Sequence, residues 1–271
     1  AYVTQGSFRG YIDKTGQRKI DISSYSFGGY FNNGIAVVEQ GSRSGYIDTQ
    51  GNLLLSGLDD AIEFGGDYAI ASKNNTTLLV STKDIDAIRH TPDPWAQEDI
   101  KRAQELSLIP DDLAIYYQKN ITRQEFCHLA IHFIEVNENC TIEQYLKEKG
   151  LTIQKDLYSD TQDYEILAAS ALGIVNGMEG DTFQPNSNIT REQAAKMLAL
   201  TGQQLGMENR SDSLFFADLG SIGMWARPHV GFVVHYGIMN GKNGNKFVPG
   251  DNYTRQEAFV TILRMYDAMN K

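Results

Sequence analysis

Three arginines occupy the same place in a phrase that the chain repeats, directly after a threonine that can begin a helix. They are Arg123, Arg191 and Arg255. A cation at the first position of a helix opposes the positive end of the helix dipole, which costs about a few tenths of a kcal/mol or more. A guanidinium beside the amide groups of a helix start forms a site for a carboxylate or phosphate. The pattern therefore predicts anion binding, with solvated or salt-bridged arginines as the alternative.

The residues around each arginine have a structural explanation. A Thr followed three residues later by Glu or Gln forms a capping box, which satisfies amide groups at a helix start. Four such pairs precede an apolar helical pattern: Thr122 with Glu125, Thr141 with Gln144, Thr190 with Gln193, and Thr254 with Glu257. These pairs predict four helix starts, and no binding function is needed to explain them.

Other residue types that could carry chemistry form no recognisable site. His128 and His132 have the helical spacing of a two-histidine metal site, but residue 129 is Leu, so the metalloprotease phrase is absent. We expect this pair on a solvated face, opposite Phe126 and Phe133. A phosphate-binding glycine loop, a nucleophile elbow and an EF-hand loop are also absent from the sequence. We therefore predict no catalytic residue, no metal and no cofactor, and we do not expect an enzyme.

Composition describes a soluble globular chain and excludes several classes of protein. The 271 residues include 24 basic and 34 acidic side chains, with a net charge of −10. The acidic balance and the lack of a basic stripe argue against nucleic-acid binding. No apolar window approaches the length of a membrane span. Cys127 and Cys140 are expected to be free thiols, and the start at Ala1, without Met or leader, suggests a processed product or a piece of a longer protein.

The amino-terminal third repeats a short phrase. Residues 10–16, beginning Gly-Tyr-Ile-Asp, return at 45–51, and the phrase Phe-Gly-Gly at 27–29 returns at 64–66. Short β-branched and aromatic runs between Gly, Asn and Asp predict β-hairpins. The pattern resembles the WG repeat of bacterial proteins, with Arg9 and Ser44 at the position of the usual Trp. We expect residues 1–85 to form a domain of antiparallel β-hairpin repeats, ended by the two prolines within 90–94.

The rest of the chain contains a longer repeat. Residues 173–191 return at 237–255, and a looser copy begins at Trp95. Each copy reads as a helix, a turn, a short extended stretch and a second helix, with one apolar stripe on each helix. Three such pairs can bury their stripes together, so we expect a mainly α, pseudo-threefold six-helix bundle, with residues 138–157 as a helical insertion. The fold class is thus α+β and multidomain.

These copies resemble S-layer homology domains, which hold bacterial surface proteins to the cell wall. The resemblance rests on Trp95, Trp225 and residues 173–177, 183–185, 189–191, 216–218 and 253–257. It implies three units, at residues 86–157, 158–215 and 216–271, arranged as a pseudo-trimeric prism. In this family, grooves between units bind secondary cell-wall polymer, often through the carboxylate of a pyruvate ketal.

The resemblance also implies a set of glycan-binding residues: Arg123, Arg191, Arg255, Trp95, Trp225, Gly177 and Gly241. The two Trp residues are expected either to stack on sugar or to lie in the core, since burial of an aromatic ring explains them equally well. Thr161 occupies the Trp position of the second unit, and the first unit lacks the Gly-Ile-Val-Asn-Gly turn. We therefore expect fewer than three equal grooves.

The expected function is non-covalent anchoring of an extracellular bacterial surface protein to cell-wall glycan, without cofactor, nucleic acid or membrane span. The β-repeats would serve as an outward spacer or an adhesive module for another surface protein or a host ligand. Two alternatives remain open. One is a protein-protein interaction scaffold that has lost glycan binding, and the other is the targeting part of a surface enzyme whose catalytic domain lies outside this sequence.

Overall fold

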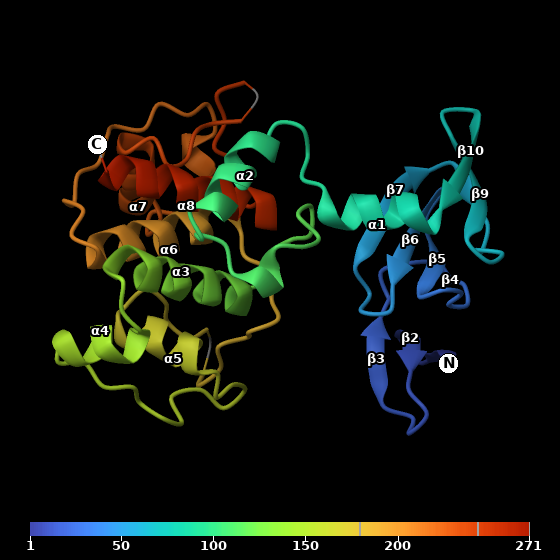
Figure 1. Cartoon of the computed structure of the whole chain (residues 1–271), viewed down its shortest axis with the longest axis horizontal. Coiled ribbons are helices and arrows are strands. Elements are labelled where there is room, and N and C mark those ends of the chain that lie inside the picture. Colours follow the sequence, from blue (N-terminus) through green and yellow to red (C-terminus); the bar gives the residue numbers. More distant parts are fainter. Residues whose placement is uncertain (179, 243, 271) are drawn as a thin grey trace. The chain divides into compact units, whose positions relative to one another are not determined.

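The computed structural model describes residues 1–178, 180–242 and 244–270. The chain divides into two compact units, Ala1–Thr91 and Pro92–Lys271. We call them the β unit and the helical unit, because the first consists mainly of antiparallel strands and the second mainly of helices (Figure 1). The presence of antiparallel sheets and helices confirms the expected α+β class.

The β unit contains three antiparallel sheets, with strand orders β1-β2-β3, β4-β5-β6-β7 and β10-β9-β8. Each sheet is centred on one hairpin, which we call the first (β1/β2), second (β5/β6) and third (β9/β10) hairpin. The strands are β1 (Tyr2–Gln5), β2 (Phe8–Ile12), β3 (Arg18–Asp21), β4 (Phe27–Gly28), β5 (Ile35–Gln40), β6 (Arg43–Asp48), β7 (Leu53–Leu58), β8 (Asp60–Ala61), β9 (Tyr68–Lys73) and β10 (Thr76–Ser81). Helix α1 (Thr82–His90) follows β10 and packs against β7.

The hairpins pack in sequence, each against the next. Tyr11 of the first hairpin stacks on Phe31, with ring centroids 4.6 Å apart, and its hydroxyl donates to the Gly29 carbonyl at 2.6 Å. Tyr46 of the second hairpin contacts Phe64 edge to face, with ring centroids 5.2 Å apart. A buried cluster joins the first sheet to the second: Tyr11, Ile20, Ile22, Ala36, Val38 and Ile47. One face of each of these two hairpins is thus covered by the segment that precedes the next hairpin.

The helical unit contains helices that pair along the chain. The pairs are α2 (Gln97–Glu105) with α3 (Arg123–Glu138), α5 (Tyr164–Ala171) with α6 (Arg191–Gln204), and α7 (Arg227–His235) with α8 (Arg255–Met269). The 3-10 turn η1 (Asp111–Leu113) lies between α2 and α3, helix α4 (Ile142–Glu148) lies between α3 and α5, and the 3-10 turn η2 (Leu219–Ser221) lies between α6 and α7. All four predicted capping boxes are confirmed, at the starts of α3, α4, α6 and α8.

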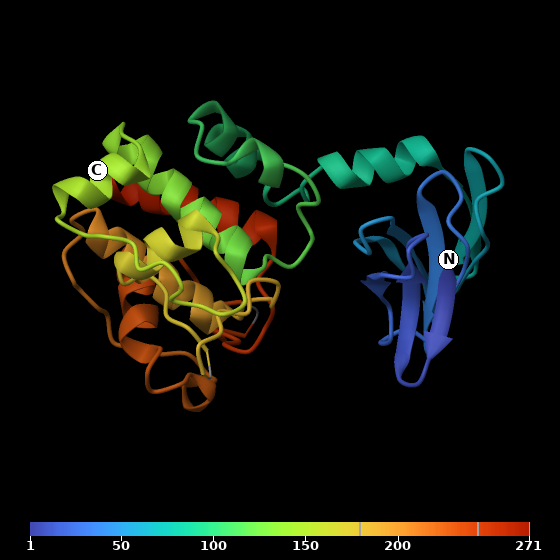
Figure 2. The ribbon, with the colours of Figure 1, turned by 90° about the horizontal axis from the view of Figure 1, so that it is seen from below.

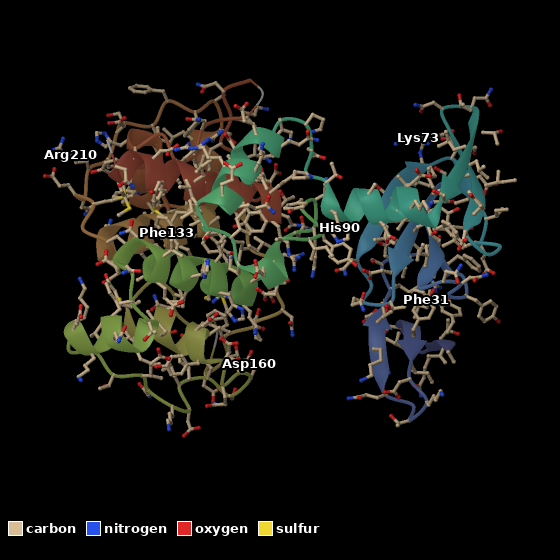
Figure 3. The ribbon with its side chains drawn as sticks, viewed as in Figure 1. Phe31, Lys73, His90, Phe133, Asp160 and Arg210 are labelled. Carbon is tan, nitrogen blue, oxygen red and sulfur yellow. The ribbon has the colours of Figure 1, made fainter. Side chains whose placement is uncertain are left out.

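The helix pairs are interlaced rather than packed side by side. The first helix of each pair packs on the second helix of the preceding pair, so α5 lies on α3, α7 lies on α6 and α2 lies on α8 (Figure 2). The three second helices contact one another at the centre, where Phe126, Phe133, Leu198 and Phe259 are fully buried. Figure 3 shows Phe133 inside the helical unit. This central position explains why α3 and α8 carry apolar residues on more than one face.

The segments before the three central helices pair with one another through single β-bridges. These bridges join Thr122 to Asn188, Thr190 to Asn252, and Asn120 to Thr254. The pairs close a ring at one end of the central helices, so that each helix start faces the loop of a neighbouring helix pair. Among the described residues, no helix is long and apolar enough to cross a membrane.

Candidate functional site

The three arginines at the helix starts lie inside the protein and hold the ring together. Arg191 is 5% exposed. Its Nε donates to the Phe247 carbonyl at 2.9 Å, its Nη2 donates to the Asn240 carbonyl at 3.0 Å, and its Nη1 lies 3.3 Å from Glu257 Oε1. All three acceptors belong to the third helix pair or to the turn between its helices. Arg191 therefore joins the second pair to the third.

Arg123 and Arg255 make the corresponding contacts around the ring. Arg123 donates to the carbonyls of Phe183 and Asn176, both at 2.9 Å, and joins the first pair to the second. Arg255 donates from Nη1 to the Ile115 carbonyl at 2.6 Å and from Nη2 to Glu125 Oε1 at 2.8 Å, which joins the third pair to the first. These arginines are buried, and most of their guanidinium nitrogens already donate within the protein.

The amide groups at these helix starts are occupied as well. In α6, the Arg191 N–H donates to the Asp251 carbonyl and the Glu192 N–H donates to the Pro249 carbonyl, at 2.9 and 3.1 Å. The next amide, of Gln193, donates to the Thr190 hydroxyl. The same two loop contacts recur at α3 and α8. The expectation of free helix-start amides that bind an anion is wrong, because the loop of the neighbouring pair supplies carbonyl acceptors that the sequence does not reveal.

Six of the seven predicted residues nevertheless lie at two surface grooves, and Arg255 is not among the lining residues of either. The first, which we call the Arg123 groove, has a volume of about 210 Å³. It combines Arg123 from α3, Gly177 from the second turn and Trp225 from the segment before α7. Its remaining walls come from the same turn and from α6: Ile174, Val175, Asn176, Met178, Gln193, Lys196 and Met197.

The second groove, the Arg191 groove, repeats this arrangement one helix pair further on. It has a volume of about 300 Å³ and combines Arg191, Gly241 and Trp95. Its other walls are Met239, Asn240, Lys242, Tyr253, Glu257, Val260, Thr261 and Arg264. In each groove the Arg, the Gly and the Trp come from three different helix pairs. Residues from distant parts of the sequence thus form a single surface.

The two tryptophans lie at the surface and not in the core. Trp95 is 54% exposed and Trp225 is 49% exposed, so the core interpretation of these residues is wrong. The Lys196 ammonium lies 5.9 Å from the centre of the Trp225 ring, within the range of a cation–π contact. An exposed aromatic face beside a cation can hold a sugar ring with an acidic substituent, because the ring stacks on the apolar face of the sugar and the cation pairs with the acid.

The two glycines are required by close packing behind the grooves. A Cβ on Gly177 would lie 2.9 Å from Cε1 of Tyr158 and 3.0 Å from the Thr182 carbonyl oxygen. A Cβ on Gly241 would lie 3.0 Å from Cε1 of Phe216. Any side chain at these positions would push the turn out into the groove. The two glycines therefore let the turns pack closely and so shape the groove walls.

The corresponding place in the third interface has a different chemistry. His128 and His132 on α3 occupy the helix positions of Lys196 on α6 and of Arg264 on α8, counted from each helix-start arginine. They line a depression of about 320 Å³ with Pro110, Asp112, Asp163, Tyr164 and Glu165. Arg255 and Thr161 are not among its lining residues. We call these residues the His128 cluster.

His128 is partly buried and contacts two carboxylates, so the expectation of a solvated face is wrong for this residue. Its Nε2 lies 3.0 Å from Asp163 Oδ2 and 3.4 Å from Glu165 Oε2. Although burial opposes protonation, the Asp163 hydrogen bond and both carboxylates raise the pKa of His128. Burial raises the pKa of Glu165. Within the described residues, no group of His, Cys, Asp and Glu has the arrangement of a metal site.

The charged groups therefore differ among the three interfaces. In the Arg123 groove the charged lining residues are the cations Arg123 and Lys196, and Gln193 stands where the Arg191 groove has Glu257. In the Arg191 groove, Lys242 lies 3.4 Å from Glu257 and 3.1 Å from Asp251. The His128 cluster is rich in carboxylates. The linings contain two cations in the Arg123 groove, three cations and one carboxylate in the Arg191 groove, and three carboxylates in the His128 cluster. The electrostatics of the two grooves therefore suit an anion better than those of the His128 cluster.

Sequence reasoning missed the cations of the groove walls. Lys196 follows Arg191 by five residues and Arg264 follows Arg255 by nine, which places both on the groove side of their helices. Helical spacing from the repeated arginines could have identified them. Lys242 could have been identified by its place next to Gly241 in the repeated turn.

Comparison with known protein families gives a match within the helical unit. Residues 155–195 and 215–259 match the S-layer homology domain. The matched S-layer homology segments contain Arg191, Gly177, Gly241, Trp225 and Arg255, and they lie within the second and third helix pairs and the loops before them.

Individual relatives contain the same kind of sequence within much longer proteins. The chain is 29% identical over 179 residues to an amylopullulanase of Thermoanaerobacterium thermosulfurigenes, covering 65% of this chain and 9% of that protein. It is 30% identical over 123 residues to the surface-layer 125 kDa protein of Lysinibacillus sphaericus, covering 44% and 10%. It is 30% identical over 94 residues to an endoglucanase of Bacillus sp. (strain KSM-635), covering 35% and 9%. The chain spans about a tenth of the length of these relatives.

Proposed function

We propose that the helical unit anchors a bacterial surface protein to the cell wall by binding an anionic secondary cell-wall polysaccharide in the Arg123 groove and the Arg191 groove. The observation that carries this proposal is the repeated groove itself. Each copy combines an exposed Trp, a turn glycine and cationic side chains in one lining. A pyruvylated terminal sugar has the matching chemistry, a stacking face and a carboxylate.

The proposal includes three S-layer homology units, at residues 86–157, 158–215 and 216–271. The family match supports the second and third units directly. The first is supported by Arg255, which closes the ring onto Ile115 and Glu125 of the first helix pair. Two of the three interfaces would bind polymer, since Thr161 replaces the Trp of the other two at the third interface and the carboxylates of the His128 cluster would repel an anion.

For the β unit we propose an outward role, as a spacer or adhesive module of WG-like hairpin repeats on the extracellular side of the wall. Its hairpins bury the tyrosines of both Gly-Tyr-Ile-Asp phrases, Tyr11 and Tyr46, against the following segment. Such stacked repeats contact mainly their neighbours and extend the molecule in one direction. Another surface protein or a host ligand would be its partner.

A second candidate function follows from two of the relatives. The amylopullulanase and the endoglucanase bear the names of enzymes and share with this chain only about a tenth of their length. This supports the alternative that the chain is the anchoring part of a longer surface enzyme. The helical unit would then have the same wall-binding role, with no catalytic residue in the matched segments.

The test is co-sedimentation of the full chain with isolated cell-wall sacculi, beside sacculi stripped of secondary polymer. The informative variant is Trp95→Ala/Trp225→Ala, because both rings are about half exposed and their loss should leave the fold intact. Met224→Ala is the matched control, since Met224 is 73% exposed, adjoins Trp225 and does not line the groove. Variants of the buried arginines are unsuitable, because they would disturb the ring itself.

We expect polymer-dependent sedimentation of the wild type and the Met224 variant, and its loss in the double tryptophan variant. Equal sedimentation with both kinds of sacculi would contradict recognition of the polymer. Failure of the folded wild type to sediment with either would contradict anchoring and favour the interaction scaffold.

A further inference from the structure

Two of the three ring arginines are paired with a carboxylate from the neighbouring helix start. Nη1 of Arg191 lies 3.3 Å from Oε1 of Glu257, and Nη2 of Arg255 donates to Oε1 of Glu125 at 2.8 Å. Both carboxylates belong to capping boxes, in which each accepts from the N–H of the threonine three residues before it. Each carboxylate therefore serves a helix start and a buried guanidinium at once.

Arg123 has no such partner, because the corresponding residue of α6 is Gln193. The Gln193 amide oxygen accepts from the Thr190 N–H at 3.0 Å, so this side chain completes the capping box without a charge. Arg123 donates from Nε and Nη2 to carbonyls, and over the described parts of the chain its Nη1 has neither an acceptor nor a carboxylate at ion-pair distance. Yet Arg123 is only 7% exposed. A buried cation without a counter-ion is unfavourable, so an anion that reaches it is stabilised.

The carboxylate of Asp160 acts on Arg123 from a distance but is occupied elsewhere. Its two oxygens accept from the N–H groups of Phe183 and Gln184, both at 2.7 Å. Asp218 makes the same two contacts in the next helix pair, so this carboxylate does not distinguish the two grooves. Burial lowers the pKa of Arg123 although the charge of Asp160 opposes this.

The two grooves thus differ in which of their cations are already paired, although the charges of their linings sum to the same value. In the Arg191 groove, Glu257 pairs with both Arg191 and Lys242. In the Arg123 groove, neither Arg123 nor Lys196 has a carboxylate at ion-pair distance among the residues that the structure describes. A carboxylate that enters the Arg123 groove would therefore meet two cations and displace no existing partner.

We propose that Gln193 makes the Arg123 groove selective for an acidic sugar, whose carboxylate takes the place that Glu257 has beside Arg191. This inference rests on the proposed binding of an anionic wall polysaccharide, and it assigns the acid-dependent part of that binding to one groove. Gln193 keeps the helix cap and leaves Arg123 and Lys196 to the ligand. In the Arg191 groove the same sugar would depend more on stacking against the tryptophan.

The test is Gln193→Glu in the full chain, in a Trp95→Ala background that leaves only the Arg123 groove with its tryptophan. The probe is the secondary polymer released from sacculi, compared with the same polymer after reduction of its carboxyl groups to alcohols. Isothermal titration calorimetry should give a dissociation constant for the acidic polymer that is raised at least about tenfold, because the new carboxylate pairs with Arg123 and repels that of the ligand. The reduced polymer should bind both proteins alike. Gln203→Glu is the matched control, since it adds the same charge to α6 outside the groove lining.

Urea unfolding separates this effect from a loss of fold. Glu completes a capping box as Gln does and would pair with Arg123, so Gln193→Glu should unfold at the same urea concentration as its parent or at a higher one. A gain in stability together with a loss of binding is the result expected of a residue that decides whether Arg123 is free for the ligand.

Equal affinity of Gln193→Glu and its parent for the acidic polymer would overturn this inference and leave the wall-binding proposal standing. An equal loss of affinity for the acidic and the reduced polymer would also overturn it, because the carboxylate would then not be the group that Gln193 admits. A folded wild type that binds neither polymer would contradict the proposed function, and this inference with it.

Discussion

At the scale of single residues, the repeated arginines gain their role from the carbonyl groups around them. Arg123, Arg191 and Arg255 are each less than 8% exposed, and each donates to backbone carbonyls of a neighbouring helix pair. A guanidinium is suited to this position because its donors point in fixed, separate directions. The groove cations that remain accessible are then those on the second turn of the helix and beyond, such as Lys196.

We expect Arg123→Ala to lower the free energy of unfolding of the helical unit by about 2–3 kcal/mol, because the Asn176 and Phe183 carbonyls lose their donors. Arg123→Lys should restore little, since one ammonium cannot replace the two separate donors. Urea unfolding followed by circular dichroism measures the change. Arg210→Ala is the control, because that side chain is 62% exposed. Equal stability of the Arg123 and Arg210 variants would contradict the proposed structural role.

At the scale of elements, the first and second helix pairs meet through a titratable contact between α3 and α5. His128 on α3 faces Asp163, which caps the start of α5 by accepting from the Ile166 N–H at 3.0 Å. The pKa of Asp163 is lowered, although burial opposes this, by the His128 hydrogen bond and the Ile166 N–H. The raised pKa of His128 and the lowered pKa of Asp163 both favour the ion pair near mildly acidic pH.

The stability from His128 is fully present below its unfolded pKa of about 6.5 and is lost as the pH rises through the raised folded value. The stability from Asp163 is present above its unfolded pKa of about 3.9 and is lost as the pH falls through the lowered folded value. We therefore expect His128→Gln to destabilise the helical unit by about 0.5–1 kcal/mol between about pH 4 and 6.5, and less at alkaline pH.

Urea unfolding at a series of pH values measures this effect. Asp163→Asn is the matched background, because Asn preserves the helix cap and removes the charge. In that background the His128→Gln effect should shrink. An effect of the same size at every pH and in both backgrounds would rule out the ion pair as its cause.

At the scale of the whole molecule, the β unit and the helical unit have separate cores. The large buried cluster of the helical unit draws its residues from Ala96 to Met265, and the cluster around Tyr11 and Ile47 lies within the β unit. Because no residue belongs to both clusters, each unit can lose its packing without exposing the core of the other.

We expect two separable unfolding transitions in the full chain, one for each unit. Arg123→Ala should move the helical transition to lower urea concentration and leave the other in place, which assigns the transitions. Far-UV circular dichroism follows mainly the helical unit, whereas near-UV signals report the buried aromatic side chains of both units and should therefore show both transitions. A single transition that moves as a whole in the variant would show that the two units unfold together.

Much of the local structure could be predicted from the sequence. The capping pairs set the starts of α3, α4, α6 and α8, because Thr and the third residue after it interact over a few ångströms of chain. Periodicity indicated the α+β class, and the repeated phrases identified the equivalent Trp, Gly and Arg positions of successive copies, among them Trp225, Gly177 and Arg123. Their meeting in one groove was expected from family resemblance alone, since they come from three different helix pairs.

Tertiary structure alone decided which groups remain available to a ligand. The sequence contains the same arginine at three helix starts, yet the carbonyls that occupy it come from Asn240, Phe247 and Ile115, far away along the chain. It also contains Gln193 in an ordinary capping pair, and only the fold places it in one groove lining with Arg123. Local hydrogen bonds and periodicity depend on neighbours in the chain and can be predicted from it. Burial and charge pairing depend on neighbours in space, so they required the fold.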